Sequence, residues 1–305
     1  YDKRMISGVI QAGSSLGILV PPSVVLVLYA MIARQPVGQL WLAGLFPGLM
    51  MALMFVIYIV IRCRLNPALG PVLSPEERNV PWREKLMLLG AGLLPLLIFG
   101  AMMVPFVKGW TSLVESSAIG ALVALLAAAL KRRLSWKVFE TSVRQTLGIS
   151  CMFMWIILAA LCFGAVFDGL GAVKAIEGLF IGKMGLSPWQ ILILMQLSYL
   201  VLGSFMDDTA MLVIVAPLYV PLVDALGFDL IWYGVLYTIT CQIAYMTPPF
   251  GYNLFLMRAM SPPEITIRDI YASIWPFVGV MLLALIIVMT FPEIALWLPN
   301  YVYGN

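Results

Sequence analysis

Apolar stretches long enough to cross a lipid bilayer recur along the whole chain, and they constrain its fold more than any other feature. A spanning helix needs about 20 predominantly apolar residues, and such stretches lie at 39–61, 86–107, 111–130, 146–167 and 272–291. Only 11% of the 305 residues are charged, against about 25% in soluble domains. A signal peptide would supply one short apolar run, so this recurrence predicts an all-α, multi-pass membrane protein.

Two other apolar stretches, 5–33 and 231–260, contain helix-breaking sequences in mid-span. The first is interrupted by GSSLGILVPPS and the second by TPPFG. Each double proline removes backbone donors at a depth where lipid offers no replacement, so we expect two discontinuous helices. The prolines concerned are Pro21, Pro22, Pro248 and Pro249.

The stretch 188–223 is too long for one crossing and is interrupted by GSFMDDT, which predicts a re-entrant helical hairpin. The basic residues favour the same topology, because cytoplasmic loops carry an excess of Lys and Arg. With a cytoplasmic N-terminus and a re-entrant hairpin, 14 of the 18 basic residues lie inside. The four outside are Arg34, Lys108, Lys174 and Lys183. A single crossing at 188–223 would move Arg258 and Arg268 outside and weaken this asymmetry.

These elements divide the chain into five regions. They are a first broken helix with its following span (1–65), a cytoplasmic linker (66–85), scaffold spans (86–187), the hairpin (188–223), and a second broken helix with a final span (224–305). Within the scaffold, 131–145 has the apolar spacing of an interfacial helix, and a solvated loop is the alternative. The chain starts without methionine inside a patterned segment, so we expect it to lack its N-terminal part.

The two broken helices and the spans after them share one plan. Pro22 precedes Pro47 by 25 residues, and Pro249 precedes Pro276 by 27. Under the topology above the two copies run in opposite directions, which predicts inverted repeats, although proline kinks without a repeat are the alternative. Inverted repeats with broken helices are typical of secondary transporters, which bind substrate and ion near the bilayer midplane.

Two adjacent carboxylates, Asp207 and Asp208, fall at the expected hairpin tip. A carboxylate at membrane depth costs roughly 2.5 to 3.5 kcal/mol, so it needs a counter-ion or a water-lined cavity. Sodium prefers carboxylate, hydroxyl and carbonyl oxygen, which favours a cation site over a tip that only reaches the interface.

Small and polar residues around the tip and the breaks complete the candidate site for sodium and substrate. They are Gly203, Ser204, Asp207, Asp208 and Thr209 in the hairpin, Thr247, Pro248, Pro249, Gly251 and Asn253 at the second break, and Gly13, Ser14, Ser15 and Gly17 at the first. Close helix packing is the alternative for each small residue taken alone. The hairpin that would face the first break falls upstream of Tyr1.

Composition excludes several classes of function. The chain contains no histidine, no GxxxxGK(S/T) phosphate loop, and four isolated cysteines without CxxC spacing. A catalytic triad, ATP hydrolysis, a disulfide framework and a structural zinc site are therefore not expected, and no catalytic residue is assigned. The net charge of +3 is too dispersed for a nucleic-acid surface. An intramembrane aspartyl peptidase using Asp207 and Asp208 and a structural membrane subunit are the alternatives to a transporter.

Five ordered motifs, AGSSLGILVPPS, AGLFPGL, GSFMDDTA, MTPPFGYNLF and FPEIALWLP, resemble the large, DctM-type permease subunit of tripartite ATP-independent periplasmic (TRAP) transporters. The family pattern places an acid at Asp207 and a more variable residue at Asp208, and it has Pro-Thr-Glu where this chain reads Leu113, Val114 and Glu115. The resemblance implies an ion-transporter-superfamily fold with an elevator mechanism in the inner membrane. It also implies sodium as coupling ion, an organic anion such as a C4-dicarboxylate or sugar acid as substrate, and two partners, a small membrane subunit and a periplasmic solute-binding protein.

Overall fold

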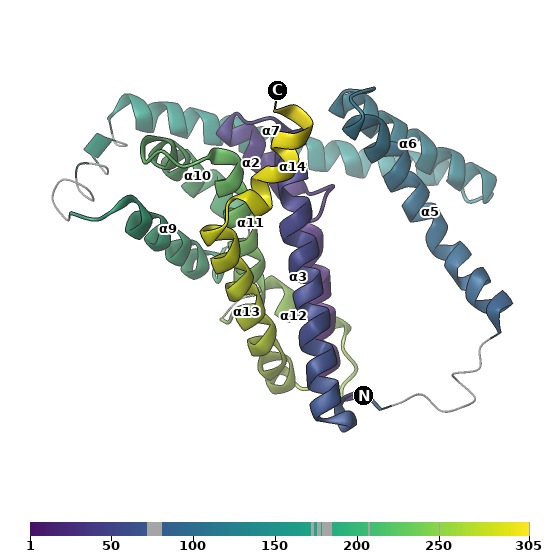
Figure 1. Cartoon of the computed structure of the whole chain (residues 1–305). Helices are drawn as coiled ribbons and strands as arrows, with labels where there is room; N and C mark the ends of the chain where they lie inside the picture. Colours follow the sequence, from purple (N-terminus) through teal and green to yellow (C-terminus); the bar gives the residue numbers. More distant parts are fainter. Residues whose placement is uncertain are drawn as a thin grey trace. The chain divides into compact units, whose positions relative to one another are not determined.

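The computed structural model describes residues 1–71, 81–171, 174–175, 178, 185–206, 208–249 and 251–304, and every regular element in these ranges is helical (Figure 1). Five of these helices are long and apolar enough to cross a membrane. The predicted all-α, polytopic class is confirmed. By their contacts the residues form two compact units, Tyr1–Gly70 with Trp155–Asn305, and Pro71–Met154.

The smaller unit contains α5 (Trp82–Val107), α6 (Leu113–Leu130) and the start of α7 (Trp136–Gly169), and α5 packs against α6. The helix α6 begins with a reciprocal cap: the Ser112 backbone N–H donates to Glu115 Oε2 at 2.7 Å, and Ser112 Oγ accepts from the Glu115 N–H. Glu115 therefore serves as a helix-start residue. The predicted linker 66–85 is described in part, and α5 begins inside it at Trp82.

The helix α7 corrects the expectation of a separate interfacial element at 131–145 followed by a span from 146. The structure has one helix from Trp136 to Gly169 instead. Its first 11 residues, Trp136 to Thr146, contain no proline or glycine, and the single Gly148 weakens a helix interior by only about 1 kcal/mol. Nothing in the local sequence therefore ends a helix that has already begun.

Both broken helices of the larger unit are confirmed. The first consists of α1 (Lys3–Ser15), the short η1 (Leu16–Ile18) and α2 (Val24–Ala33), and it is followed by α3 (Val37–Leu65). The second consists of α11 (Leu230–Met246) and α12 (Tyr252–Met260), and it is followed by α13 (Ile267–Thr290). The double proline lies in the gap in both cases.

The stretch 188–223 forms two helices, α9 (Pro188–Gly203) and α10 (Asp208–Ala225). Gly203 faces Met211 across the turn, and Ser198 Oγ lies 2.9 Å from the Tyr219 hydroxyl further along both helices. The residues in these two contacts lie progressively further from the turn on both helices, which is the pattern of an antiparallel pair. The chain therefore returns toward its starting side, as the predicted topology requires.

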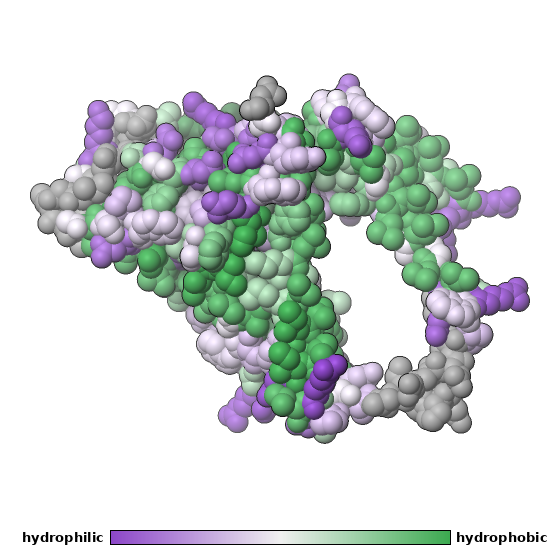
Figure 2. Space-filling model, in the orientation of Figure 1, coloured by the Kyte–Doolittle hydropathy of each residue, from purple (hydrophilic) through white to green (hydrophobic). Residues whose placement is uncertain are grey.

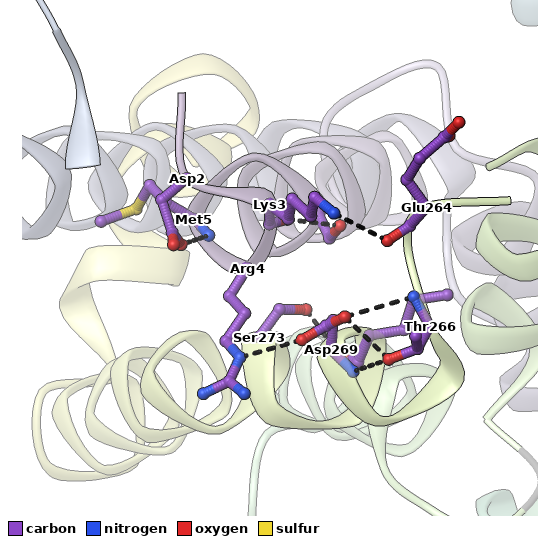
Figure 3. A network of polar contacts seen from close by, with 10 residues as sticks. Asp2, Lys3, Arg4, Met5, Glu264, Thr266, Asp269 and Ser273 are labelled. Carbon is purple, nitrogen blue, oxygen red and sulfur yellow. Dashed lines mark hydrogen bonds and ion pairs between the residues drawn. The ribbon is translucent and has the colours of Figure 1, made fainter. Parts of the chain in front are cut away.

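The broken helices pack reciprocally around the core of the larger unit. The helix α1 contacts α13, while α11 contacts α3; α2 contacts α11, while α12 contacts α1. Polar contacts hold the start of α1 near the start of α13. Arg4 Nε lies 3.1 Å from Asp269 Oδ1, and Lys3 Nζ donates to the Glu264 carbonyl at 2.9 Å (Figure 3).

A further helix, α14 (Glu293–Tyr303), packs on α3 and was not expected from the sequence. Before its last turn, which carries the exposed Arg62 and Arg64, α3 has an apolar exposed surface (Figure 2), with side chains at Leu49, Leu53, Val56, Ile57, Val60 and Ile61. Exposed aliphatic side chains along a 29-residue helix are what lipid contact requires. The inner-membrane location expected from the sequence agrees with this surface.

Candidate functional site

The helix α11 lies at the centre of the candidate site. Every residue from Trp232 to Met246 is buried, and α11 contacts α9, α13, α3, α2, α12 and α10 (Figure 1). A helix buried on all sides must satisfy its polar side chains within the protein. The partners of these side chains therefore show which elements α11 holds together.

The hairpin is seated on α11 by one close approach and one hydrogen bond. A Cβ added to Gly203 would lie 2.6 Å from Ala244 Cβ, so only glycine allows the two helices to come this near. The buried Tyr237 hydroxyl donates to the Asp208 carbonyl at 2.9 Å. Both ends of the turn, Gly203 and Asp208, are thereby fixed against the same helix.

The polar side chains of the hairpin make local contacts. Ser204 Oγ donates to the Leu200 carbonyl at 2.8 Å. Asp208 Oδ1 accepts from the Thr209 backbone N–H at 2.7 Å, at the first turn of α10. A carboxylate at a helix N-terminus also interacts favourably with the helix dipole. Asp207, the other acid predicted at the tip, lies outside the described residues.

At the second break the chain leaves α11 at Thr247, whose backbone is extended and whose hydroxyl donates to the Ile243 carbonyl at 2.7 Å. Pro248 and Pro249 have no N–H and cannot continue the helix. A Cβ at Gly251 would lie 2.6 Å from the Tyr245 carbonyl oxygen and 3.0 Å from the Thr247 carbonyl oxygen. Two backbone carbonyls therefore approach one glycine, and the Thr247 carbonyl accepts from the Gly251 N–H at 3.2 Å. The remaining carbonyl lone pairs at this break suit a hard cation.

Asn253 lies in the first turn of α12, directly after this break. The end of α11 presents carbonyl groups to the break, and the start of α12 presents N–H groups. A cation and an anionic group can therefore both be accommodated at one interruption.

At the first break, three of the four candidate residues lie on one exposed face of the chain, namely Gly13, Ser14 and Gly17. A Cβ at either glycine would meet nothing within 4 Å. Ser15 is buried instead, and its hydroxyl donates to the Ala12 carbonyl at 2.8 Å. The exposed three remain free to face a ligand, whereas the Ser15 side chain belongs to the packing of α1.

One side chain joins α11 directly to the first break. Gln242, on α11, donates from Nε2 to the Ser15 carbonyl at the end of α1, at 2.9 Å. The structure therefore brings the hairpin, the second break and the first break to one helix. Among the described residues no group of three or more His, Cys, Asp or Glu side chains comes together. A cation bound by these elements would rely mainly on carbonyl, hydroxyl and amide oxygens.

Sequence reasoning did not single out Gln242 or Tyr237. A third such residue is Gln196 on α9, whose Oε1 lies 2.6 Å from the Thr240 hydroxyl of α11. The signal was present in the sequence, because a glutamine inside the runs ILILMQLSYL and ITCQIAYM is a polar group in a membrane segment. Such residues usually face the protein interior and mark functional regions.

Comparison with known proteins agrees with this architecture. The family model described as "Tripartite ATP-independent periplasmic transporter, DctM component" matches residues 1–294. The C4-dicarboxylate TRAP transporter large permease protein DctM of Pseudomonas aeruginosa is 33% identical over 304 residues, covering 99% of this chain and 69% of that protein. DctM of Vibrio cholerae is 31% identical, covering 100% and 70%. The sialic acid TRAP transporter permease protein SiaT of Haemophilus influenzae is 26% identical, covering 98% and 47%.

Proposed function

Because the chain belongs to the DctM family of TRAP transporters, we propose that it forms part of a sodium-coupled importer of an organic anion. The family consists of inner-membrane permease subunits and not of enzymes, so the aspartyl peptidase alternative is wrong. TRAP transporters combine a large permease with a small membrane subunit and a periplasmic binding protein. We propose the same two partners for this chain, with the periplasmic protein delivering the substrate.

The observation that carries the proposal is the meeting of two helix breaks and a hairpin on α11. Breaking a helix in hydrocarbon leaves N–H and C=O groups that cost several kcal/mol when unpaired, so the breaks must face protein, water or a ligand. The carbonyls of Tyr245 and Thr247 converge at Gly251, and the hairpin approaches α11 one turn earlier, at Ala244. Oxygen groups gathered in this way support a sodium site.

The reciprocal packing of the two broken helices supports inverted repeats. Each first half-helix contacts the full span of the other copy, α1 with α13 and α11 with α3. Such a pattern is expected when two copies are related by a pseudo-two-fold axis in the membrane plane. In the proposed mechanism the unit built around α11 moves substrate and ion together, in an elevator motion.

Relatives differ in the substrates their names give: C4-dicarboxylate, sialic acid, isethionate and ectoine. Three of these are net anions at neutral pH, which is why we propose an organic anion such as a dicarboxylate or a sugar acid. A purely structural membrane subunit is the remaining alternative. It predicts no uptake when the other components are present.

Uptake by a complete transporter tests the proposal. The chain spans about 70% of the DctM proteins it matches, so the full-length protein should be reconstituted in proteoliposomes with both partners. Each net charge moved inward gains about 2.3 kcal/mol per 100 mV, so sodium in excess of substrate charge drives accumulation. Uptake that persists without sodium, or that needs internal ATP, would refute the proposal.

Asp207 is proposed as the carboxylate of the sodium site at the second break. Removing a carboxylate takes away the formal charge that offsets dehydration of the ion, while the carbonyl dipoles remain. Asp207→Asn should therefore raise the sodium concentration for half-maximal uptake without preventing insertion, and Asp208→Asn should do less. If Asp207→Asn kept its sodium dependence while Asp208→Asn lost uptake, the assignment of the sodium ligand to Asp207 would be wrong.

A further inference from the structure

An open groove lies between α3 and α14, which pack along each other with α14 running toward the start of α3 (Figure 1). The volume of this groove is about 650 Å³. Its lining consists of Phe46, Leu49, Met50 and Leu53 from α3, and of Glu293, Ile294 and Trp297 from α14. All of these side chains except Glu293 are apolar, so the groove combines an apolar channel with one carboxylate.

The groove lies at the depth of the hydrocarbon layer. Arg62 is the first charged residue of α3 and marks where this helix leaves the bilayer. Phe46 and Leu53 precede Arg62 by 16 and 9 residues, which is about 24 and 14 Å at the rise of an α-helix. Both distances fall within the roughly 30 Å of the hydrocarbon core. A soluble partner does not reach this depth, whereas the acyl chains of lipids surround it.

The carboxylate of Glu293 has no basic partner from the protein. Neither of the segments that form the groove, 37–61 and 269–305, contains a lysine or arginine. Within the part of the chain that the structure describes, Glu293 is exposed and takes part in no ion pair. A carboxylate among lipid chains is costly without a counter-ion. A cation supplied by the surroundings of the groove would therefore be favoured at Glu293.

A second hollow adjoins the groove at Glu293 and Trp297. Its volume is about 370 Å³, and Leu296, Asn300 and Tyr301 complete its lining. The rings of Trp297 and Tyr301 stack with their centroids 5.5 Å apart, yet these residues remain 55% and 75% exposed. Tryptophan and tyrosine are typical of the boundary between lipid and water. An ammonium group is attracted both to a carboxylate and to aromatic rings, so this hollow suits an organic ammonium.

We propose that the groove and the hollow together bind a phospholipid whose headgroup carries an ammonium group, such as phosphatidylethanolamine. One acyl chain lies in the groove between α3 and α14. The ammonium group lies in the hollow, against the Glu293 carboxylate and the rings of Trp297 and Tyr301. None of these residues belongs to the hairpin or to either helix break, so the inference does not depend on sodium coupling.

Thermal unfolding of the purified full-length protein in an uncharged maltoside detergent tests the headgroup. Phosphatidylethanolamine and phosphatidylglycerol with the same acyl chains are added in separate series. A lipid that binds the folded state raises Tm, and phosphatidylethanolamine should do so at lower concentration than phosphatidylglycerol. Glu293→Gln should raise the half-saturating concentration of phosphatidylethanolamine at least tenfold, which corresponds to about 1.4 kcal/mol of binding free energy. Glu264→Gln is the matched control, because this exposed carboxylate lines neither cavity, and it should keep the wild-type value.

A second pair of variants tests the position of the acyl chain. Leu49→Trp places a larger side chain in the groove and should raise the half-saturating concentration of phosphatidylethanolamine severalfold. Val60→Trp makes a comparable change on the exposed surface of the same helix, outside the groove. It should leave lipid binding unchanged.

Several results would overturn the inference. One is a wild-type Tm that does not respond to phosphatidylethanolamine or that responds equally to both lipids. Another is a Glu293→Gln variant that behaves like Glu264→Gln. If the small membrane subunit abolished the lipid response, and Glu293→Gln weakened binding of that subunit instead, the groove would be a protein interface and the lipid assignment would be wrong.

Discussion

Replacing Gly203 with alanine should force the hairpin away from α11. The added Cβ would lie 2.6 Å from Ala244 Cβ and 3.5 Å from the end of the Met211 side chain. Carbon atoms in contact prefer about 3.5 to 4.0 Å, so the first distance must grow by about 1 Å. Both atoms are Cβ atoms, whose positions the backbone fixes, and no side-chain rotation can relieve the clash. One helix must therefore move.

Two opposing effects set the magnitude. Overpacking a core costs about 1 to 3 kcal/mol, while glycine to alanine in a helix gains about 0.5 to 1 kcal/mol. Gly203 is the last residue of α9, where the gain is smallest, so we expect a net loss of about 1 to 2 kcal/mol. Gly279 in α13 is the matched control, because a Cβ there meets nothing within 4 Å. Gly279→Ala should leave stability unchanged or raise it.

Thermal unfolding of the purified full-length protein compares the two variants, and the sodium dependence of uptake reports the position of the hairpin. Gly203→Ala should lower Tm and raise the sodium concentration for half-maximal uptake. Adding Ala244→Gly should restore both, because neighbouring residues that share one clash show a coupling energy in a double-mutant cycle. A Gly203→Ala variant as stable as Gly279→Ala, with normal sodium dependence, would show that the hairpin does not rest on α11 as described.

Two further predictions concern the hairpin and the topology. Tyr237→Phe loses the bond to the Asp208 carbonyl and should raise the half-saturating sodium concentration severalfold, since a buried hydrogen bond contributes about 0.5 to 1.5 kcal/mol. Tyr233→Phe, whose hydroxyl donates to the Tyr199 hydroxyl at 3.1 Å, should lose similar stability with normal sodium dependence, and equal sodium shifts in both variants would contradict the positioning role of Tyr237. Single cysteines at 108 and 137 test the topology in whole cells: an impermeant thiol reagent should label position 108 and not position 137, and the reverse pattern would overturn the assignment.

The broken helices could be predicted from the sequence because their cause is local. A proline lacks the N–H that a helix needs, so Pro21–Pro22 and Pro248–Pro249 interrupt α-helix whatever surrounds them. The hairpin followed from the length of 188–223 and the polar residues in its middle. The sequence signals for the helix starts at Ser112 and Ser187 are also local. Each serine is followed three residues later by Glu115 or Gln190, which completes a reciprocal cap.

The contacts between helices could not be predicted, because no local signal records which faces meet. Gln242 reaches Ser15 across 227 positions in the sequence, and Gly203 approaches Ala244 only because α9 lies on one particular side of α11. The helix α14 was missed for a related reason, because its packing on α3 depends on where α3 lies. The prediction also failed in α7, because the apolar spacing of 131–145 indicated a separate interfacial helix, whereas one helix continues from Trp136 to Gly169.

Relatives with different substrate names are 26% to 33% identical to this chain. DctM of Rhodobacter capsulatus is 28% identical, the sialic acid permease SiaM of Vibrio cholerae 27%, and the ectoine permease TeaC of Halomonas elongata 26%. A site built from carbonyls at helix breaks needs prolines to expose the carbonyls and glycines to admit the ion, and beyond the proposed Asp207 carboxylate it does not need a particular side chain. Ion coupling of the proposed kind can therefore persist while the substrate changes. The residues that distinguish substrates should be sought among side chains that lie at the breaks, such as Ser14 and Asn253, and in the periplasmic protein proposed to deliver the ligand.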